Sequence, residues 1–481
     1  MSRRLARSLV FFSSASVLVI ELLAARILAP YVGVSLETFT GIIGVVLAGI
    51  AVGAWVGGRA ADRGDPGRLI GPLLVAGGLL SMAAPLIVDV IGPALGGDPV
   101  SIVLGAALGF FAPAVVLSAI PPVVVKIRLV SLDETGTVVG SYSAVGTAGA
   151  IVGTFVTGFV LLVAFPTRPI VTALGAMLIT AGLALWRQGG RGKGALVAVA
   201  VGLAGLLLAV DGPCDRETTY HCAVVAVDAD RPTGRVLVLD RVRNSYVDVA
   251  DPTHLEFRYV QLIADVVDGT FAPGPLRVVS IGGGALTLPT YLSVTRPGTV
   301  NVALEIDGPL VALVEDEFGI DRSVAVVVGD ARLSLAELPA TSADVIIGDA
   351  FSGTSVPWHL TTVEFVREID RVLAADGLYV MNVIDHGDHR FARAAVATLY
   401  GEFAEVAVFA PASYLGESAG GNFVIVAAHR PIDEVAVEAA IRARGGEEEA
   451  WSGATLKAFV DGATPLTDDY APVDQLLGSA R

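Results

Sequence analysis

The stretch LRVVSIGGG, residues 276–284, decides the fold of the second half of this chain. An apolar run that ends in three glycines is typical of a buried strand followed by a turn where a ligand approaches the backbone closely. Apolar runs of the same kind recur downstream and alternate with helical segments, which predicts a parallel α/β sheet. Strands are expected at 276–281, 300–305, 324–328, 344–348, 377–383, 405–409 and 422–428.

Acidic residues follow these strands, at the sheet edge where such folds bind their ligands. Glu305 closes the second strand in NVALEID (301–307), where a carboxylate can accept from both hydroxyls of a ribose. Asp330 closes the third in VVGDAR (327–332) and can accept from an adenine amino group. Each carboxylate alone is better explained as a helix cap or a solvated side chain. Carboxylates at successive strand ends, however, favour a nucleoside site.

The residues after the glycines exclude two types of phosphate-binding motif. No Gly-Lys-Ser/Thr follows Gly284, so a P-loop is excluded, and the Ala-Leu-Thr that does follow it does not match GxGxxG. A ligand without a pyrophosphate is therefore favoured, and adenosine that carries a sulfonium fits best.

The fourth strand ends in DVIIGDAFSG (344–353), which sets Asp349 at the same edge. A carboxylate beside a sulfonium carbon can orient an incoming amine and accept its proton as a C–N bond forms. The alternative is that Asp349 caps the helix expected to start near Thr361.

Composition separates this half from the first. The chain has 53% hydrophobic and only 17% charged residues, whereas soluble domains carry about 25% charged residues. Residues 1–211 hold 13 Lys and Arg against 9 Asp and Glu, and the remainder holds 19 against 39. A membrane domain fused to an acidic globular domain is therefore expected. The net charge of −16 argues against nucleic acid as a partner.

Apolar stretches in the first half predict about seven membrane-spanning helices, since a span needs about 20 residues. The first is expected to be an uncleaved span because Glu21 and Arg26 interrupt it. Lys and Arg gather in alternate loops, which predicts a cytoplasmic N-terminus and, with seven spans, an external acidic domain. The stretches are 9–28, 38–57, 69–91, 100–125, 137–163, 169–186 and 194–210; the basic loop residues are Arg3, Arg4, Arg7, Arg59, Arg63, Arg68, Lys126, Arg128, Arg187, Arg191 and Lys193, against Arg168 in the other loops.

Small residues at four-residue spacing mark two expected helix contacts. Gly49, Gly53 and Gly57 share one helix face, as do Gly149 and Gly153. Packing within one bundle is favoured over a face dedicated to dimerisation. Glu21 and Arg26 are costly in a bilayer and should meet a partner or a watery cavity.

The junction carries the chain's two cysteines, Cys214 and Cys222. They can form a disulfide across a turn in an oxidising compartment, and two free thiols are the alternative. Downstream, VLVLD (236–240) and SYVDVAD (245–251) alternate as short strands. HLEFRYVQLIADVVD (254–268) has apolar residues at helical spacing.

The motifs IGGG, EID, GDA and GDAFSGTSVPWHLTTVEF (348–365) resemble those of the spermidine synthases, most closely the subgroup fused to a membrane domain. The tail LTDDYAPVDQLL (466–477) and ELLAARILAPYVG (21–33) share the resemblance. It implies a seven-stranded methyltransferase-like fold behind a β-rich lead-in. The implied reaction transfers aminopropyl from decarboxylated S-adenosylmethionine to putrescine and releases methylthioadenosine.

The resemblance also implies roles for single residues. Asp349 matches the catalytic aspartate. The nucleoside positions are Gly282, Gly283, Gly284, Glu305, Ile306, Asp307, Asp330, Ala331 and Asn244, and the amine positions are Glu256, Tyr259, Gln261 and Ser352. The departures from the family pattern are Ser352 for aspartate, Gln261 for glutamate, Leu255 for aspartate, Arg241 and Leu286 for glycine, and Asn244 for glutamine. A diamine would lose much of its charge pairing here, which favours a larger, singly charged or different amine.

The expected architecture is thus an α-helical transmembrane bundle (1–211), a β-rich lead-in with the amine-site helix (212–274) and a nucleoside-binding catalytic domain (275–481). The expected function is aminopropyl transfer at a membrane, with no metal and no tightly bound cofactor. Methyl transfer from S-adenosylmethionine and a non-catalytic polyamine sensor or transport-linked protein are the alternatives. Expected partners are an amine, an adenosyl sulfonium, the lipid bilayer and further copies of the chain. An external domain conflicts with a cytosolic sulfonium substrate.

Overall fold

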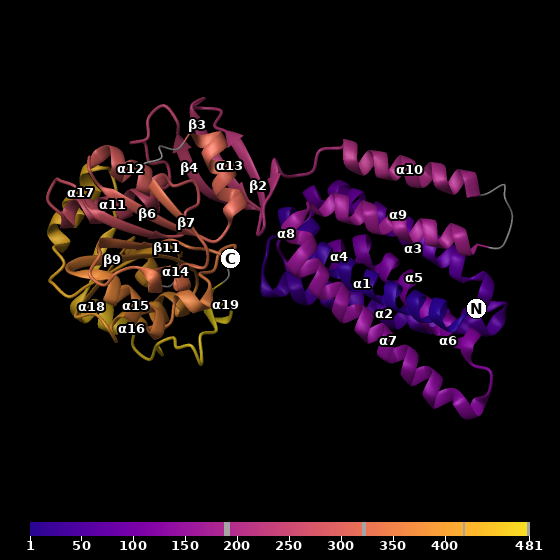
Figure 1. The fold of residues 1–481 in the computed structure, drawn as a ribbon. Helices are drawn as coiled ribbons and strands as arrows, with labels where there is room; N and C mark the ends of the chain where they lie inside the picture. The colour runs from indigo at the N-terminus through magenta and orange to yellow at the C-terminus, as the bar shows by residue number, and fades with distance from the viewer. Residues whose placement is uncertain (187–192, 320–323, 417–418, 479–481) are drawn as a thin grey trace. The chain divides into compact units, whose positions relative to one another are not determined.

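The computed structural model describes residues 1–186, 193–319, 324–416 and 419–478 (Figure 1). The chain forms two compact units, Met1–Ala223 and Val224–Arg481. Two of the basic loop residues named above, Arg187 and Arg191, lie outside the described residues.

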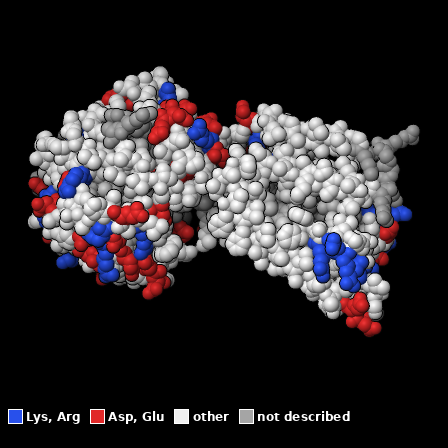
Figure 2. Space-filling view, in the orientation of Figure 1, with Lys and Arg blue, Asp and Glu red and all other residues white. Residues whose placement is uncertain are grey.

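Six helices of the first unit are long and apolar enough to cross a membrane. A shorter apolar helix, α10 (Lys193–Ala209), follows them and packs against α3 and α9. Figure 2 shows the flank of this unit almost free of charged side chains, while Lys and Arg gather at the end that holds the N-terminus. The helical segments are α1 (Arg3–Val32), α2 (Leu36–Arg63), α3 (Ile70–Ile91), α4 to α6 (Pro99–Ala106, Ala112–Ser118, Ile120–Arg128), α7 and α8 (Thr135–Val156, Leu162–Ala164) and α9 (Thr167–Leu185).

The glycine faces pack inside this bundle. A Cβ placed on Gly53 would lie 2.3 Å from the carbonyl oxygen of Val115, so α2 approaches α5 at backbone distance. A Cβ on Gly149 would likewise lie 2.2 Å from the carbonyl oxygen of Phe11 in α1. Both faces therefore make contacts between helices of a single chain, as expected for small residues at this spacing.

Arg168 holds the last apolar helix in place. Its Nη2 lies 2.6 Å from Oδ2 of Asp89, and its Nη1 donates to the carbonyl oxygen of Val210 at 2.6 Å. Val210 directly follows α10, whose last carbonyls have no partners within the helix. Because Arg168 lies at the start of α9 and Val210 just after the end of α10, these two helices are antiparallel.

A disulfide joins Cys214 and Cys222, in agreement with the pairing expected from the sequence. The segment between them includes β1 (Arg216–Glu217), which pairs with β2 (Cys222–Val227). Nη1 of Arg26 donates to the carbonyl oxygen of Thr219 at 3.0 Å, and the backbone N–H of Thr167 donates to Glu217 at 2.8 Å. Arg26 therefore finds its partners in this segment. For Glu21, the described residues include no ion-pair partner.

The second unit is built on two sheets. A four-stranded antiparallel sheet, in the order β1-β2-β3-β4, includes β3 (Gly234–Leu239) and β4 (Val242–Asp248). An eight-stranded sheet follows, in the order β12-β10-β11-β9-β8-β5-β6-β7. Its strands are β5 (Arg277–Ile281), β6 (Val300–Glu305), β7 (Val324–Val328), β8 (Ala343–Gly348), β9 (Leu373–Asp385), β10 (Glu405–Ala410), β11 (Gly421–Ala428) and β12 (Glu449–Trp451).

The seven strands expected from the sequence are present, but the prediction of seven strands, all parallel, is wrong. The short β12 adds an eighth strand antiparallel to β10. Strand β11 runs antiparallel to both β9 and β10. Three residues are too few to show a hydrophobic period, and strand direction depends on connections rather than on the apolar run itself.

Helices cover both faces of the large sheet and bury its alternate side chains. One face packs against α11 (Arg258–Thr270), α12 (Thr287–Thr295) and α17 (Glu434–Ala443). The other packs against α15 (Val363–Val372), α16 (Arg390–Leu399) and α18 (Gly453–Phe459). The helix expected from residue 254 begins at Arg258. The parallel strands end at one edge, where the expected site residues lie.

Candidate active site

The glycine turn after β5 is shaped by contacts that exclude side chains. Gly282 and Gly284 have φ values of 95° and 50°, which L-residues rarely adopt. A Cβ on Gly282 would lie 2.5 Å from the carbonyl oxygen of Asp349, and one on Gly283 would lie 3.1 Å from Glu305. The turn therefore brings the ends of β5, β6 and β8 together.

Glu305 is held in a fixed orientation by backbone donors. Its Oε2 accepts from the N–H of Gly283 at 2.8 Å, and its Oε1 accepts from the N–H of Asp307 at 2.9 Å. The side chain is 8% exposed. Oε2 also accepts from the N–H of Gly284 at 3.3 Å, so Oε1, which accepts one hydrogen bond, is the oxygen that keeps a free acceptor position.

The other expected nucleoside positions serve first as helix caps. Asp307 is buried and caps α13 (Gly308–Phe318) by accepting from the N–H of Leu310. Asp330 caps α14 (Ala331–Glu337), and its Oδ2 lies 3.1 Å from Nε2 of His359. The cap alternative raised for these carboxylates thus holds for both. Ile306, which directly follows Glu305, is 43% exposed, and Ala331 is buried in the first turn of α14.

Asn244 reaches the glycine turn from β4. Its Oδ1 accepts from the hydroxyl of Ser245 at 2.7 Å, and that hydroxyl oxygen accepts from the N–H of Ala285 at 3.1 Å. A Cβ on Gly284 would lie 2.9 Å from Oδ1 of Asn244. The small sheet therefore contributes to the same edge as the large sheet.

Asp349 lies directly after β8, between an amide and a phenol. Nδ2 of Asn382 in β9 donates to its Oδ1 at 2.8 Å, and the hydroxyl of Tyr259 in α11 also hydrogen-bonds to it. Burial raises the pKa of the Asp349 carboxyl, while the two hydrogen bonds act in the opposite direction. Burial and the carboxylate raise the pKa of Tyr259 well above its usual value. Tyr259 therefore stays protonated and donates a hydrogen bond to Asp349.

The remaining expected amine positions do not face Asp349 in this way. Gln261 donates to the carbonyl oxygen of Leu255 at 2.6 Å and accepts from Arg258 at 2.9 Å. Glu256 lies 3.2 Å from Nε2 of His254. Ser352 is exposed in a tight turn, in which its N–H donates to the carbonyl oxygen of Ser355 at 2.8 Å. Of the four positions, only Tyr259 contacts Asp349.

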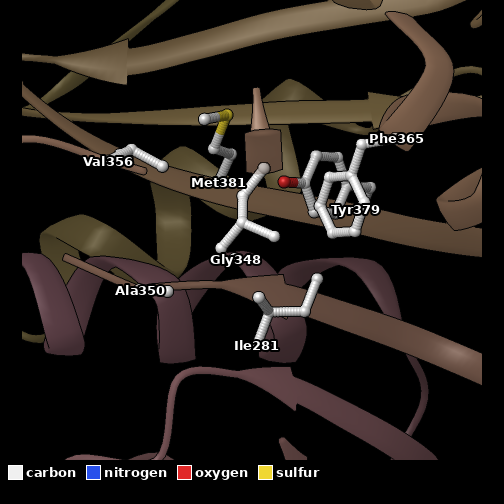
Figure 3. Close-up of a pocket in the computed structure, with 8 residues that line it drawn as sticks. Ile281, Gly348, Ala350, Val356, Phe365, Tyr379 and Met381 are labelled. Carbon is white, nitrogen blue, oxygen red and sulfur yellow. The ribbon is translucent and has the colours of Figure 1, made fainter. Parts of the chain in front are cut away.

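A small apolar pocket of about 10 Å³ has the two sequence neighbours of Asp349, Gly348 and Ala350, in its wall (Figure 3). Its other lining residues are Ile281, Val356, Leu360, Phe365, Tyr379 and Met381. A Cβ on Gly348 would lie 2.6 Å from the hydroxyl of Tyr379, so glycine is required there.

Sequence reasoning missed Asn382, Asn422, Ser245 and His359. Asn382 stands in the apolar run YVMNVID (379–385), where a polar residue inside a buried strand was the available signal. For Asp468, the sequence showed only that the LTDD tail resembles the family, without a role for this residue. It forms two hydrogen bonds with Arg332, at 2.8 and 2.6 Å, which anchors the tail to α14.

Comparison with known proteins finds similarity to polyamine aminopropyltransferases. A polyamine aminopropyltransferase of Vibrio vulnificus is 30% identical over 173 residues, covering 34% of this chain and 56% of that protein. One of Chromobacterium violaceum is 24% identical over 220 residues, covering 45% and 80%. The crystal structure of a probable spermidine synthase from Corynebacterium glutamicum matches at 30% identity with a TM-score of 0.50, covering 54% of this chain and 97% of that one. No family model matches the chain.

The fold and the residues at the strand ends define an α/β protein with a methyltransferase-like, Rossmann-like sheet. The chain belongs to the spermidine synthase family, and its apolar helices are consistent with a membrane-fused member. It spans just over half the length of the Vibrio relative.

Proposed function

We propose that this chain is a membrane-embedded aminopropyltransferase that uses decarboxylated S-adenosylmethionine and releases methylthioadenosine. The observation that carries the proposal is the approach of Asp349 and Tyr259 beside the glycine turn and Glu305. A carboxylate with a raised pKa that is still held by two donors suits a general base.

In the proposed reaction, an uncharged amine nitrogen attacks the methylene carbon bound to the sulfonium. The C–N bond forms as the C–S bond breaks, and the bonding pair stays on sulfur to give a neutral thioether. The new ammonium group passes one proton to Asp349. Tyr259 would keep the carboxylate oriented toward the nitrogen.

The nucleoside is proposed to lie over the glycine turn. Glu305 would accept from the ribose through the free acceptor position of Oε1, and Asp330 would accept from the adenine amino group. Ile306 and Ala331 would contribute apolar contacts, and Asn244 would close the turn from β4. The side chains proposed to contact the nucleoside offer hydrogen-bond acceptors and apolar surface. Such a lining suits a ligand that carries no phosphate.

The acceptor is proposed to be an amine that needs no carboxylate partner for a second ammonium group near its reacting nitrogen. Support comes from Gln261, whose amide is used by Leu255 and Arg258, and from Ser352, which cannot pair with a second ammonium group as a carboxylate would. A monoamine or a long polyamine would meet this site with a smaller loss than putrescine.

The test is release of methylthioadenosine by the full chain in lipid nanodiscs, with decarboxylated S-adenosylmethionine and a series of mono-, di- and polyamines. We expect release with at least one amine and none from the Asp349→Asn variant. Release with no amine, together with tighter calorimetric binding of S-adenosylmethionine itself, would overturn the proposal in favour of methyl transfer.

We also propose that the second unit is extracytoplasmic, which requires that its sulfonium substrate reaches that side of the membrane. Support comes from α10, which would add a seventh crossing to the six long apolar helices, and from Arg26 and Thr167, which hydrogen-bond to residues 217–219. The positive alternate loops and a disulfide agree with this orientation. An impermeant thiol reagent should label Cys214 and Cys222 in intact cells only after reduction. Labelling that requires broken cells would contradict the orientation.

A further inference from the structure

Two asparagines on neighbouring strands form a hydrogen-bonded series that ends at Asp349. Nδ2 of Asn422 in β11 donates to Oδ1 of Asn382 in β9 at 3.0 Å, and Nδ2 of Asn382 donates to Oδ1 of Asp349 at 2.8 Å. Asn422 pairs in register with Ile384, so it shares a sheet face with Asn382, two residues away. Asn382 is 1% exposed.

The series can run in only one direction. An ionised carboxylate only accepts hydrogen bonds, so Asn382 must turn its NH2 group toward Asp349 and its carbonyl oxygen away. That oxygen is buried and needs a donor, which Asn422 supplies. Each amide therefore determines the orientation of the next.

We propose that Asn382 and Asn422 are positioning residues, an amide relay that holds Asp349 in the rotamer and the ionised form in which it accepts the proton of the amine. This inference rests on the proposed function, in which Asp349 is the base. It adds a device that the motif residues do not contain, because both asparagines lie in strands outside those motifs.

Few groups surround the carboxylate of Asp349 and can keep it ionised. Helix α11 presents the phenol of Tyr259, β9 and β11 present the two neutral amides, and the turn after β5 presents the backbone of Gly282. In the described part of the chain, no Lys, Arg or His forms an ion pair with this carboxylate. Donated hydrogen bonds are thus what offsets burial and keeps Asp349 ionised.

The test is the pH profile of kcat/KM for aminopropyl transfer by the Asn422→Asp variant of the full chain in nanodiscs. A carboxylate at 422 accepts from the NH2 group of Asn382 and turns the Asn382 oxygen toward Asp349, so two acceptors face each other. We expect the acidic limb to move up by about one pH unit and kcat/KM below the limb to fall about tenfold, since one unit corresponds to a factor of ten. Affinity for methylthioadenosine should stay within about twofold, because the relay does not touch the glycine turn. Asn422→Ser, which keeps a donor, should return the limb toward that of the parent.

If the parent transfers aminopropyl and a folded Asn422→Asp variant keeps the parental profile, the relay is wrong. If the parent transfers no aminopropyl group, the proposed function fails. The relay is then tested by the pH dependence of the thermal midpoint. Asn422→Asp should then lose stability relative to the parent as pH rises, and this loss should shrink in an Asp349→Asn background. A loss equal in both backgrounds, or no loss, would overturn the relay.

Discussion

The hydroxyl of Tyr259 hydrogen-bonds to the carboxylate of Asp349, although one lies on a helix before the large sheet and the other on a strand end within it. The contact depends on the first turn of α11. Arg258, the neighbour of Tyr259, forms two hydrogen bonds with Glu448, at 2.9 and 2.6 Å, which anchor that turn. A structural ion pair thus holds a side chain of the proposed site.

Tyr259→Phe removes one of the two donors that oppose the burial of Asp349. The pKa of the Asp349 carboxyl should rise further, because a hydrogen bond to the charged form is lost. The acidic limb of the kcat/KM profile should therefore move to higher pH, with a loss of about tenfold below the limb. A limb that moves to lower pH would contradict the donor role of Tyr259.

Asp349→Asn should remove the proton acceptor and keep the fold. Loss of a general base costs about 10²- to 10⁴-fold in rate, so methylthioadenosine release should fall by that factor. Thermal stability should be equal to or greater than that of the parent, because burial disfavours the charged form that is removed. An active variant would show that the base lies elsewhere.

The double substitution Cys214→Ser and Cys222→Ser should destabilise the segment at the end of the first unit. The bond closes a loop with a sequence separation of 8, for which chain entropy predicts a loss of about 2–3 kcal/mol in the free energy of unfolding. The thermal midpoint of the parent should fall similarly in reductant, and that of the variant should not respond to it. A reductant effect of equal size on both would show that the bond does not stabilise the protein.

Gly53→Ala should disturb the bundle, because the new Cβ would lie 2.3 Å from the carbonyl oxygen of Val115. Overpacking of this kind costs about 1–3 kcal/mol. Gly44→Ala on the same helix is the matched control, since a Cβ there meets nothing within 4 Å. The thermal midpoint in detergent should fall for Gly53→Ala and not for Gly44→Ala. Equal midpoints would mean that α2 and α5 do not pack as closely as described.

Much of the site could be predicted because parallel strands place their carboxyl ends at one edge. The apolar runs, the glycines from 282 to 284 and the acidic residues after them were enough to bring Glu305 and Asp349 to the same place. The roles of Gln261 and Ser352 could not be predicted in this way. Gln261 is used by Leu255 and Arg258, and that choice depends on how the first turn of α11 packs.

The sequence by itself determined the apolar helices, the strands β5 to β11 and the glycine turn. These features are local, since periodicity, chain stiffness and short spacing act within a few residues. Only the tertiary structure decided that β11 runs antiparallel beside β9, which brings Asn422 to Asn382 and Asn382 to Asp349. Strand order and register depend on contacts between distant segments, so local sequence patterns do not predict them.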